Sequence, residues 1–403
     1  MQILVLDTIH GGKVIRDHLI LSGYSTDMVD VYRQSDGISE HEAVQKKYDL
    51  IIAPIHLDPD YHLFRRLYAP VITHHQAVRW LLKGSDEKTI EITGKRGKST
   101  TASALAYLLP GNGILQASTG LVRYPKKEIS SKLSITPASL LIASKNKPEN
   151  GWMIAEVSLG FCGIGTLGII TSEEDYLVAC GKRSALTIKK ESSHVLPRVL
   201  VPPGFSLVHD RFIDASDLVK IDGNTARYRF KNKDFSITNP LFTLPGYHIP
   251  LMLACAAALL LDINPAPLSS FQPLPGRMEV KEESGYIILD NSNSGTCYQT
   301  SADAFRYITN IGDYKTVTLI IGQESASVCE NFSTDEICST IEQGKPQHVI
   351  LIPGDKRIKC DSIRMICSTN NIGFSLASSS DEGLQLAKTK GNSLILLAVK
   401  RWK

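Results

Sequence analysis

The sequence predicts an α/β protein built from three consecutive units. Apolar runs typical of buried parallel strands recur along the chain, and helical patterns follow most of them. Clear examples are ILVLD (3–7), TIEITG (89–94) and TVTLIIG (316–322). In addition, 403 residues exceed what one ordinary hydrophobic core needs, so two or three domains are expected.

Changes in composition along the chain give the boundaries of these units. The first unit spans residues 1–86 and ends in the polar linker KGSDEK. The second spans 87–273. It includes, from about 195 to 245, short β-rich segments that predict a small antiparallel insertion. A Pro-rich stretch, NPAPLSSFQPLPGR, predicts a hinge, and the third unit follows at 274–403.

Composition argues against several classes of protein. A hydrophobic content of 43% and a net charge of +3 are typical of a globular protein and give no reason to expect nucleic-acid binding. No run reaches the roughly 18 apolar residues that a membrane span needs. The first residues, MQILVLDTIHGG, resemble a strand rather than a signal peptide. With eight cysteines and no Cys-x-x-Cys pair, we expect reduced thiols and a cytoplasmic location.

The strongest chemical signal is TGKRGKST at 93–100, between a predicted strand and a predicted helix. Backbone N–H groups and the positive end of a helix dipole at such a turn bind phosphate. Lys98 would reach the outer phosphates, and the hydroxyl of Ser99 or Thr100 would help to hold Mg²⁺. The spacing is shorter than in the common loop, with two residues instead of four between the glycines. A chance turn is the alternative, which the flanking strand and helix disfavour.

This loop and three later segments resemble, in the same order, the motifs of the Mur ligase family. The later segments are MIAEVSLG (153–160), PLPGRMEV (273–280) and ILDNSNSGT (288–296). The resemblance covers essentially the whole chain. It implies an ATP-dependent ligase with an N-terminal Rossmann-like substrate domain, a central P-loop ATPase domain and a C-terminal Rossmann-like domain.

The resemblance also implies roles for individual residues, with ATP and Mg²⁺ bound. Glu156 would hold Mg²⁺ together with Ser99, Arg277 would approach the phosphates on domain closure, and Asp290 would touch the ribose. The implied catalytic residues are Lys98, Glu156, Arg277 and Lys189, the last of which roughly matches a carbamylated lysine of some members. The implied nucleotide-binding residues are Thr93, Gly94, Lys95, Arg96, Gly97, Lys98, Ser99, Thr100, His248, Arg277, Asp290 and Asn293.

Two departures from the family pattern bear on this site. Tyr176 stands where family members usually carry a metal-binding histidine, which leaves a second Mg²⁺ open. In the adenine pocket, Ile249 and Met252 stand where members carry amides. His248 either lines that pocket or is an ordinary core histidine.

Polar residues follow three predicted strands of the first unit. Asp7 and His10 follow the first strand, His56 follows another, and His74 and His75 end VITHH. The carboxyl ends of parallel strands line the ligand crevice of an open α/β sheet. These residues therefore predict a pocket for a polar, anionic or metal-bearing ligand. The alternative is that they are ordinary loop histidines.

Seven segments, from LDTIHGG to DNSNSGT, together are most similar to one branch of the family, the ligases of methanogens that close the last carbocyclic ring of a nickel tetrapyrrole. This resemblance implies that ATP converts a propionate of the macrocycle to an acyl phosphate, which a carbon of the same macrocycle then attacks. Lys182 and Arg183 would suit the other carboxylates of that substrate. The sequence identifies no base for the attacking carbon and leaves the oligomeric state open.

Two other functions remain open at this point. One is an amide-forming, Mur-type peptide ligase, which would need an amino acid as second substrate. The other is a carrier that binds ATP and a tetrapyrrole without turnover. A dinucleotide oxidoreductase is disfavoured, because no strand runs into Gly-x-Gly-x-x-Gly.

Overall fold

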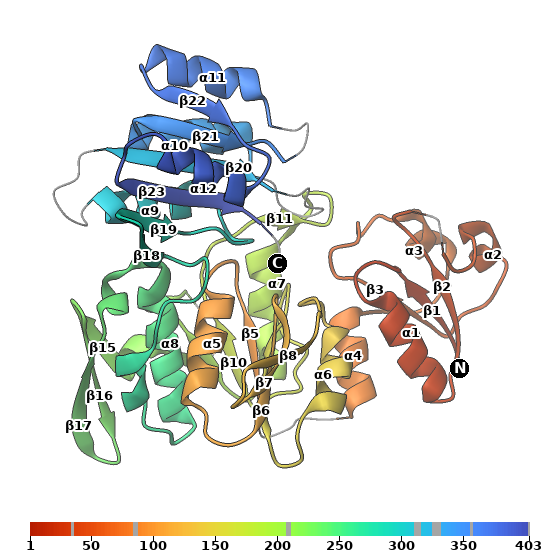
Figure 1. Cartoon of the computed structure of the whole chain (residues 1–403). Helices are drawn as coiled ribbons and strands as arrows, with labels where there is room; N and C mark the ends of the chain where they lie inside the picture. Colours follow the sequence, from red (N-terminus) through yellow and green to blue (C-terminus); the bar gives the residue numbers. More distant parts are fainter. Residues whose placement is uncertain are drawn as a thin grey trace. The chain divides into compact units, whose positions relative to one another are not determined.

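The computed structural model describes residues 1–33, 36–83, 88–206, 211–309, 316–324, 332–354 and 358–401. They form two compact units, the first comprising 1–242 with 249–271 and the second 243–248 with 272–403 (Figure 1). Both units are built on mainly parallel sheets with helices in the connections, which confirms the predicted α/β class. No helix within the described ranges combines the length and apolarity that a bilayer crossing requires.

The N-terminal part of the first unit is a four-stranded parallel sheet of order β2-β1-β3-β4. Its strands are β1 (Gln2–Leu6), β2 (Ser25–Val29), β3 (Leu50–Ala53) and β4 (Val71–Thr73). The helices are α1 (Gly12–Leu21), α2 (Glu40–Val44), α3 (His62–Arg66) and α4 (His74–Leu82). Alternate residues of β1 enter two different apolar clusters, Ile3 and Val5 on one face and Leu4 and Leu6 on the other. Burial on both faces explains the continuous apolar run.

The central part of the same unit is an eight-stranded sheet of order β14-β13-β10-β5-β9-β6-β7-β8. Its strands are β5 (Thr89–Thr93), β6 (Gly113–Ala117), β7 (Gly120–Tyr124), β8 (Glu128–Ser131), β9 (Trp152–Glu156), β10 (Leu167–Ile170), β13 (Val199–Val201) and β14 (Phe212–Asp214). The helices are α5 (Lys98–Leu108), α6 (Ser139–Asn146), α7 (Ala185–Ser192) and α8 (Pro245–Leu260). Only β7 runs opposite to the other strands, and it pairs antiparallel with β6 and with the edge strand β8. The carboxyl ends of β10, β5, β9 and β6 therefore meet at one edge of the sheet.

The β-rich stretch predicted as one antiparallel insertion is divided between two sheets. β13 and β14 extend the central sheet in parallel, because Val199–Val201 is apolar throughout and buried. Only β15 (Val219–Asp222), β16 (Thr225–Phe230) and β17 (Lys233–Thr238) form a separate antiparallel sheet. A further short pair is β11 (Leu177–Val178) with β12 (Arg183–Ser184). The 3-10 helices are η1 (Ser193–Val195), η2 (Ala215–Asp217), η3 (Pro240–Thr243) and η4 (Ala266–Ser270).

The second unit contains a six-stranded sheet of order β18-β19-β23-β20-β21-β22, in which only β18 is antiparallel. Its strands are β18 (Glu279–Glu283), β19 (Tyr286–Asp290), β20 (Val317–Gln323), β21 (His348–Ile352), β22 (Gly373–Leu376) and β23 (Leu394–Lys400). The helices are α9 (Tyr298–Thr309), α10 (Thr334–Gly344), α11 (Cys360–Thr369) and α12 (Ser380–Lys388). This is the architecture predicted for a Rossmann-like terminal domain.

A buried carboxylate shapes the loop that follows β9. Glu91, in β5, accepts hydrogen bonds from the backbone N–H groups of four consecutive residues, 162–165, at 2.6–3.0 Å. Burial raises the pKa of this carboxyl group above its ordinary value, although the four N–H donors favour its charged form and oppose that shift. The loop therefore depends on one side chain for the hydrogen bonds of its interior.

We expect Glu91→Gln to lower the free energy of unfolding by about 3 kcal/mol, because the amide turns an N–H₂ group toward buried backbone donors. Urea unfolding followed by far-UV circular dichroism measures this loss. Glu128→Gln, an exposed position on β8, is the matched control. Equal unfolding midpoints for the two variants would show that the loop does not depend on Glu91.

Candidate active site

The phosphate loop joins the carboxyl end of β5 to the first turn of α5. Gly94 and Gly97 have φ values of +144° and +83°, which disfavour side chains. A Cβ on Gly94 would also lie 2.1 Å from Thr171 Oγ1, at the end of β10. The glycines thus close the turn against the neighbouring strand, which explains how a loop with only two intervening residues still delivers the N-terminus of α5 to this edge.

The predicted Mg²⁺ ligands lie at the same edge of the central sheet. Glu156 is the last residue of β9, is 1% exposed, and is paired in register with Ile92, two residues before Gly94. Ser99 lies in the first turn of α5, and its Oγ is 3.5 Å from the Oγ of Ser118, which follows β6. Both candidate ligands offer oxygen atoms, the donors that Mg²⁺ prefers.

The loop is held by its own lysine and by the segment after β10. Lys98 Nζ donates to the carbonyls of Gly94 at 2.8 Å and Lys95 at 3.3 Å. Ser172 Oγ accepts hydrogen bonds from the N–H groups of Lys95 and Arg96, at 3.0 and 3.3 Å. A phosphate group that binds here would exchange these contacts for its own. Thr93 and Thr100 are buried in the strand and helix that flank the loop.

Tyr176 brings two lysines together beside the loop. Lys189, in α7, is 1% exposed, and its Nζ lies 4.6 Å from the centroid of the Tyr176 ring. The Nζ of Lys95, in the phosphate loop, lies 5.7 Å from the same centroid. Ammonium groups at these distances are attracted by the aromatic ring. Tyr176, at the position where the resemblance leads us to expect a histidine, therefore makes cation–π contacts with Lys95 and Lys189.

Aromatic and acidic side chains gather at the carboxyl edge of the N-terminal sheet. The ring centroid of His10 lies 4.4 Å from that of His56 and 5.0 Å from that of Tyr32. The His10 Nδ1 is 3.4 Å from Asp7 Oδ1. Burial raises the pKa of Asp7. Hydrogen bonds from His10 and Ile9, together with the nearby histidines, lower the pKa by more, so the pKa lies below its ordinary value. Sequence reasoning missed Tyr32, although it follows β2 much as the histidines follow β1 and β3.

His74 and His75 lie in the first turn of α4 and not in a strand, as VITHH had suggested. Thr73 and Gln76 form a reciprocal capping box, which ends β4 at Thr73 and begins the helix. His75 Nε2 lies 2.9 Å from the carbonyl of Ser158, after β9, to which it donates. His74 remains near Asp7 and the other histidines.

Burial keeps three of these histidines uncharged at neutral pH. It lowers the pKa of His56 to about 4, of His74 to about 3 and of His75 to about 4. Neutral imidazoles do not attract carboxylates as cations do, but they are suitable metal ligands. The cluster therefore favours the metal-bearing alternative over the anionic one.

Lys182 and Arg183 lie beside the segment that contains His56. Lys182 Nζ is 2.7 Å from both Asp58 Oδ1 and Asp60 Oδ2. Arg183 Nη1 donates to the carbonyl of Ile55 at 3.5 Å. The structure therefore brings these two predicted substrate residues to the first sheet, where Lys182 is engaged by two carboxylates.

The predicted nucleotide residues of the second unit lie near one another. Asp290, at the end of β19, is 3.2 Å from Arg401 Nη2. Asn293 Nδ2 donates to the carbonyl of Gly276 at 2.9 Å, and the carbonyl of Arg277 accepts a 2.8 Å hydrogen bond from Tyr247. Arg401 was not foreseen from the sequence. The roles of Arg277, Asp290, Asn293 and His248 in nucleotide binding stay predictions.

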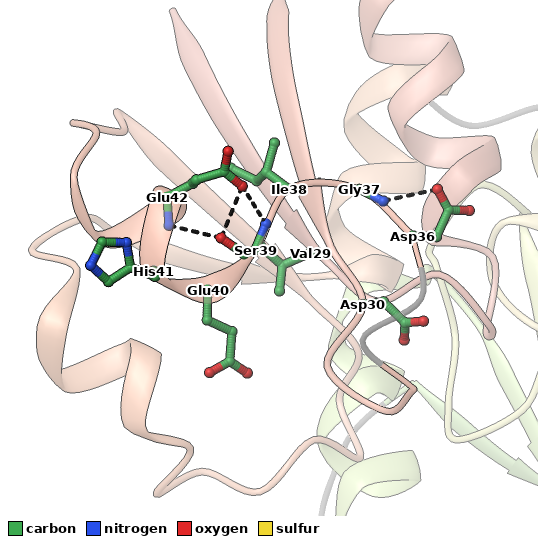
Figure 2. A pocket seen from close by; sticks show the side chains of 9 residues that line it. All are labelled: Val29, Asp30, Asp36, Gly37, Ile38, Ser39, Glu40, His41 and Glu42. Carbon is green, nitrogen blue, oxygen red and sulfur yellow. Dashed lines mark hydrogen bonds between the residues drawn. The ribbon is translucent and has the colours of Figure 1, made fainter.

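A pocket of about 550 Å³ lies elsewhere, between the end of β2 and α2 (Figure 2). Its lining includes Asp30, Asp36, Glu40 and Glu42, and none of the predicted site residues. Figure 2 shows Ser39 and Glu42 joined by reciprocal capping hydrogen bonds. Its acidic lining would repel a nucleotide or a polycarboxylate, so we place the active site at the two sheet edges instead.

Solved structures show which proteins share this fold. A pseudomurein peptide ligase type C from Methanothermus fervidus aligns with a TM-score of 0.54 and 13% identity, over 99% of this chain and 97% of that one. A bifunctional folylpolyglutamate synthase/dihydrofolate synthase from Yersinia pestis, complexed with AMPPNP and Mn ion, aligns with a TM-score of 0.56 and 15% identity, over 81% and 89%. The chain therefore shares the fold of these two enzymes, and its phosphate loop lies at the N-terminus of α5.

Sequence comparison identifies the family to which the chain belongs. A relative from Methanosarcina acetivorans named Coenzyme F(430) synthetase is 30% identical, over 99% of this chain and 98% of its own length. A family model described as Coenzyme F430 synthetase CfbE, C-terminal domain, matches residues 280–401. The chain belongs to the coenzyme F(430) synthetase family.

Lys98→Ala is expected to weaken binding of an ATP analogue such as AMPPNP about 10- to 100-fold, because a charged hydrogen-bond donor to the phosphates is lost. Isothermal titration calorimetry measures the affinity. Lys233→Ala, an exposed lysine on β17, should bind like the wild type. Unchanged affinity in Lys98→Ala would place the nucleotide elsewhere.

His75 gives a prediction for pH. Its pKa in the folded chain, about 4, lies below the ordinary value of 6.5, so between these values only the unfolded chain binds a proton. The free energy of unfolding should therefore fall as the pH drops from 6.5 toward 4, by up to about 1.4 kcal/mol per pH unit from this residue. Urea unfolding of His75→Gln should show a slope smaller by about that amount.

His41→Gln, an exposed position on α2, is the control for that experiment and should keep the wild-type slope. The assignment fails when His75→Gln and wild type lose stability equally over this range.

Proposed function

We propose that the protein closes the last carbocyclic ring of the nickel tetrapyrrole coenzyme F-430. ATP phosphorylates a propionate of 15,17(3)-seco-F-430-17(3)-acid, which gives an acyl phosphate and ADP. A carbon of the same macrocycle loses a proton and attacks the acyl carbon, so that a C–C bond forms, the C–O bond to phosphate breaks, and a cyclic ketone and phosphate result. This reaction belongs to coenzyme synthesis for methanogenesis.

The observation that carries this proposal is a phosphate loop at a parallel sheet edge in a chain that matches a Coenzyme F(430) synthetase along its whole length. The buried Glu156, one strand from the loop, supports a metal-assisted phosphoryl transfer. A second substrate is not required, because the attacking carbon and the activated carboxylate belong to one molecule. Holding them in a reactive pose replaces roughly 7–11 kcal/mol of entropic barrier.

In this proposal the first unit binds both the phosphates of ATP and the macrocycle. Lys98 would bind the outer phosphates, and Ser99 and Glu156 would hold Mg²⁺, which would neutralise charge on the phosphates. Lys95 and Lys189, which both contact the Tyr176 ring, add positive charge beside the loop.

The macrocycle would lie against the carboxyl edge of the N-terminal sheet. The rings of His10 and His56 would contact it, and Lys182 and Arg183 would bind its carboxylates. His75 contacts the carbonyl of Ser158, two residues after Glu156, so the cluster is linked directly to the segment that follows the candidate metal ligand.

The test is release of phosphate from ATP and Mg²⁺ with the nickel seco-tetrapyrrole acid, while the visible spectrum of the macrocycle is followed. We expect one phosphate per ring closed, and a loss of at least about 100-fold in kcat for Glu156→Gln, because a metal ligand is removed. Asp217→Asn, at an acidic position outside the site, should retain the wild-type rate.

Two outcomes would contradict the proposal. Phosphate release that depends on an added amino acid would identify a peptide ligase. Binding of both ATP and macrocycle without release would identify a carrier.

A further inference from the structure

The side-chain cluster at the edge of the N-terminal sheet has features that binding of carboxylates does not explain. Every strand of the sheet contributes to it, with His10 after β1, Tyr32 after β2, His56 after β3 and His74 after β4. The Nε2 atoms of His56 and His74 are buried and have no hydrogen-bond partner among the described residues. Buried polar atoms of this kind call for a partner, such as a water, an ion or a ligand.

Asp7 is held in a conformation that suits a positioning role. Its φ is +130°, in a region that costs non-glycine residues of order 1–3 kcal/mol, and such strain gathers at functional sites. Its buried carboxylate accepts hydrogen bonds from the N–H groups of Ile9, at 2.7 Å, and His10, at 2.8 Å. The same carboxylate faces His10 Nδ1 at 3.4 Å. Asp7 thus fixes both the backbone and the ring of His10.

The ring of His10 is also held from its sides. His56 and Tyr32 both lie edge-on to it, with interplanar angles of 79° and 73°. The Nδ1 atom of His10 is buried, yet 23% of the side chain is exposed. Part of the His10 side chain is therefore accessible, while its buried Nδ1 faces Asp7. A carboxylate at one nitrogen of an oriented imidazole is the arrangement that tunes histidine ligands of metals.

We propose that the Nε2 of His10 binds the nickel ion of the macrocycle as an axial ligand, with Asp7 orienting the imidazole through Nδ1. This inference rests on the proposed function, which supplies a ligand that carries its own metal. Within the described residues no group of three or more metal-ligating side chains forms a protein metal site. A macrocycle needs only one axial ligand, because its four ring nitrogens already hold the metal.

Axial ligation would give the N-terminal sheet a way to orient a nearly flat substrate. One bond to the metal fixes the distance of the macrocycle from the sheet edge, and the rings of His56 and Tyr32 limit its tilt. The propionate that is activated is then presented to the phosphate loop in a defined position, which is the condition for an intramolecular attack.

The experiment is nickel K-edge X-ray absorption and visible spectroscopy of the nickel seco-tetrapyrrole acid bound to the full chain, with ATP omitted so that no turnover occurs. Wild-type protein should add an axial nitrogen to four-coordinate nickel. His10→Ala should leave the nickel without that ligand and bind the macrocycle about 10- to 100-fold more weakly, and added imidazole should restore the spectrum.

Three controls accompany it. Asp7→Asn keeps the shape and tolerates positive φ, and it should weaken binding about 10-fold while the axial ligand remains. His41→Ala, on α2 between β2 and β3, should bind the macrocycle as the wild type does. The same macrocycle without nickel should bind His10→Ala and wild type equally. Binding of AMPPNP to each variant verifies that the chain is folded.

The outcomes separate this inference from the proposed function. Nickel that gains no axial nitrogen in the wild type, or equal loss of nickel and nickel-free macrocycle in His10→Ala, would overturn the axial ligand while ring closure stands. Failure of the wild type to bind the macrocycle at all would overturn the proposed function, and the axial ligand with it.

Discussion

The phosphate loop of the candidate nucleotide site is held in place by hydrogen bonds to the segment after β10. Thr171 Oγ1 donates to the carbonyls of Thr93 and Arg96, and Ser172 Oγ accepts from two N–H groups of the loop. Four residues later the same segment places the ring of Tyr176 against Lys95 and Lys189. A single stretch of chain thus sets both the backbone of the loop and the position of its neighbouring cations.

The two sheet edges of the first unit use different electrostatics. The central edge combines the lysines of the loop and α7 with a buried carboxylate, as phosphoryl transfer requires. The N-terminal edge presents histidines that burial keeps neutral, with Asp7 as their carboxylate neighbour. Charge alone would favour anions at the central edge, whereas the N-terminal edge is better suited to a metal held in an organic ring. The difference follows from burial, since an imidazole in water would be partly protonated.

Much of this organisation was predictable, because it rests on local patterns. The sequence directly predicted the strand, glycine turn and helix around 93–100. The buried apolar runs predicted the strand ends that carry Asp7, His10 and His56. The parallel pairing of β13 with β10 was not predicted, although VLV is typical of a buried strand, because the neighbouring prolines suggested a separate antiparallel insertion.

Contacts between residues far apart in the sequence could not be predicted from local patterns. Glu91 looked like any polar residue in a strand, and only the fold shows four N–H groups converging on it. Tyr32 carries no motif, so its place beside His10 emerges only when β2 is paired with β1. Lys182 meets Asp58 across 124 positions of sequence, a separation at which composition gives no information.

The two aspartates beside Lys182 carry the same charged group, a carboxylate, as the propionates of the proposed substrate. Asp58 and Asp60 each lie 2.7 Å from its ammonium group, at an exposed position where solvent screens the charges and such pairs contribute little. A propionate of the macrocycle that binds Lys182 would compete with these internal anions. The net free energy of that contact is then the difference between two similar ion pairs, so Lys182 would select a carboxylate by its position and add little to affinity.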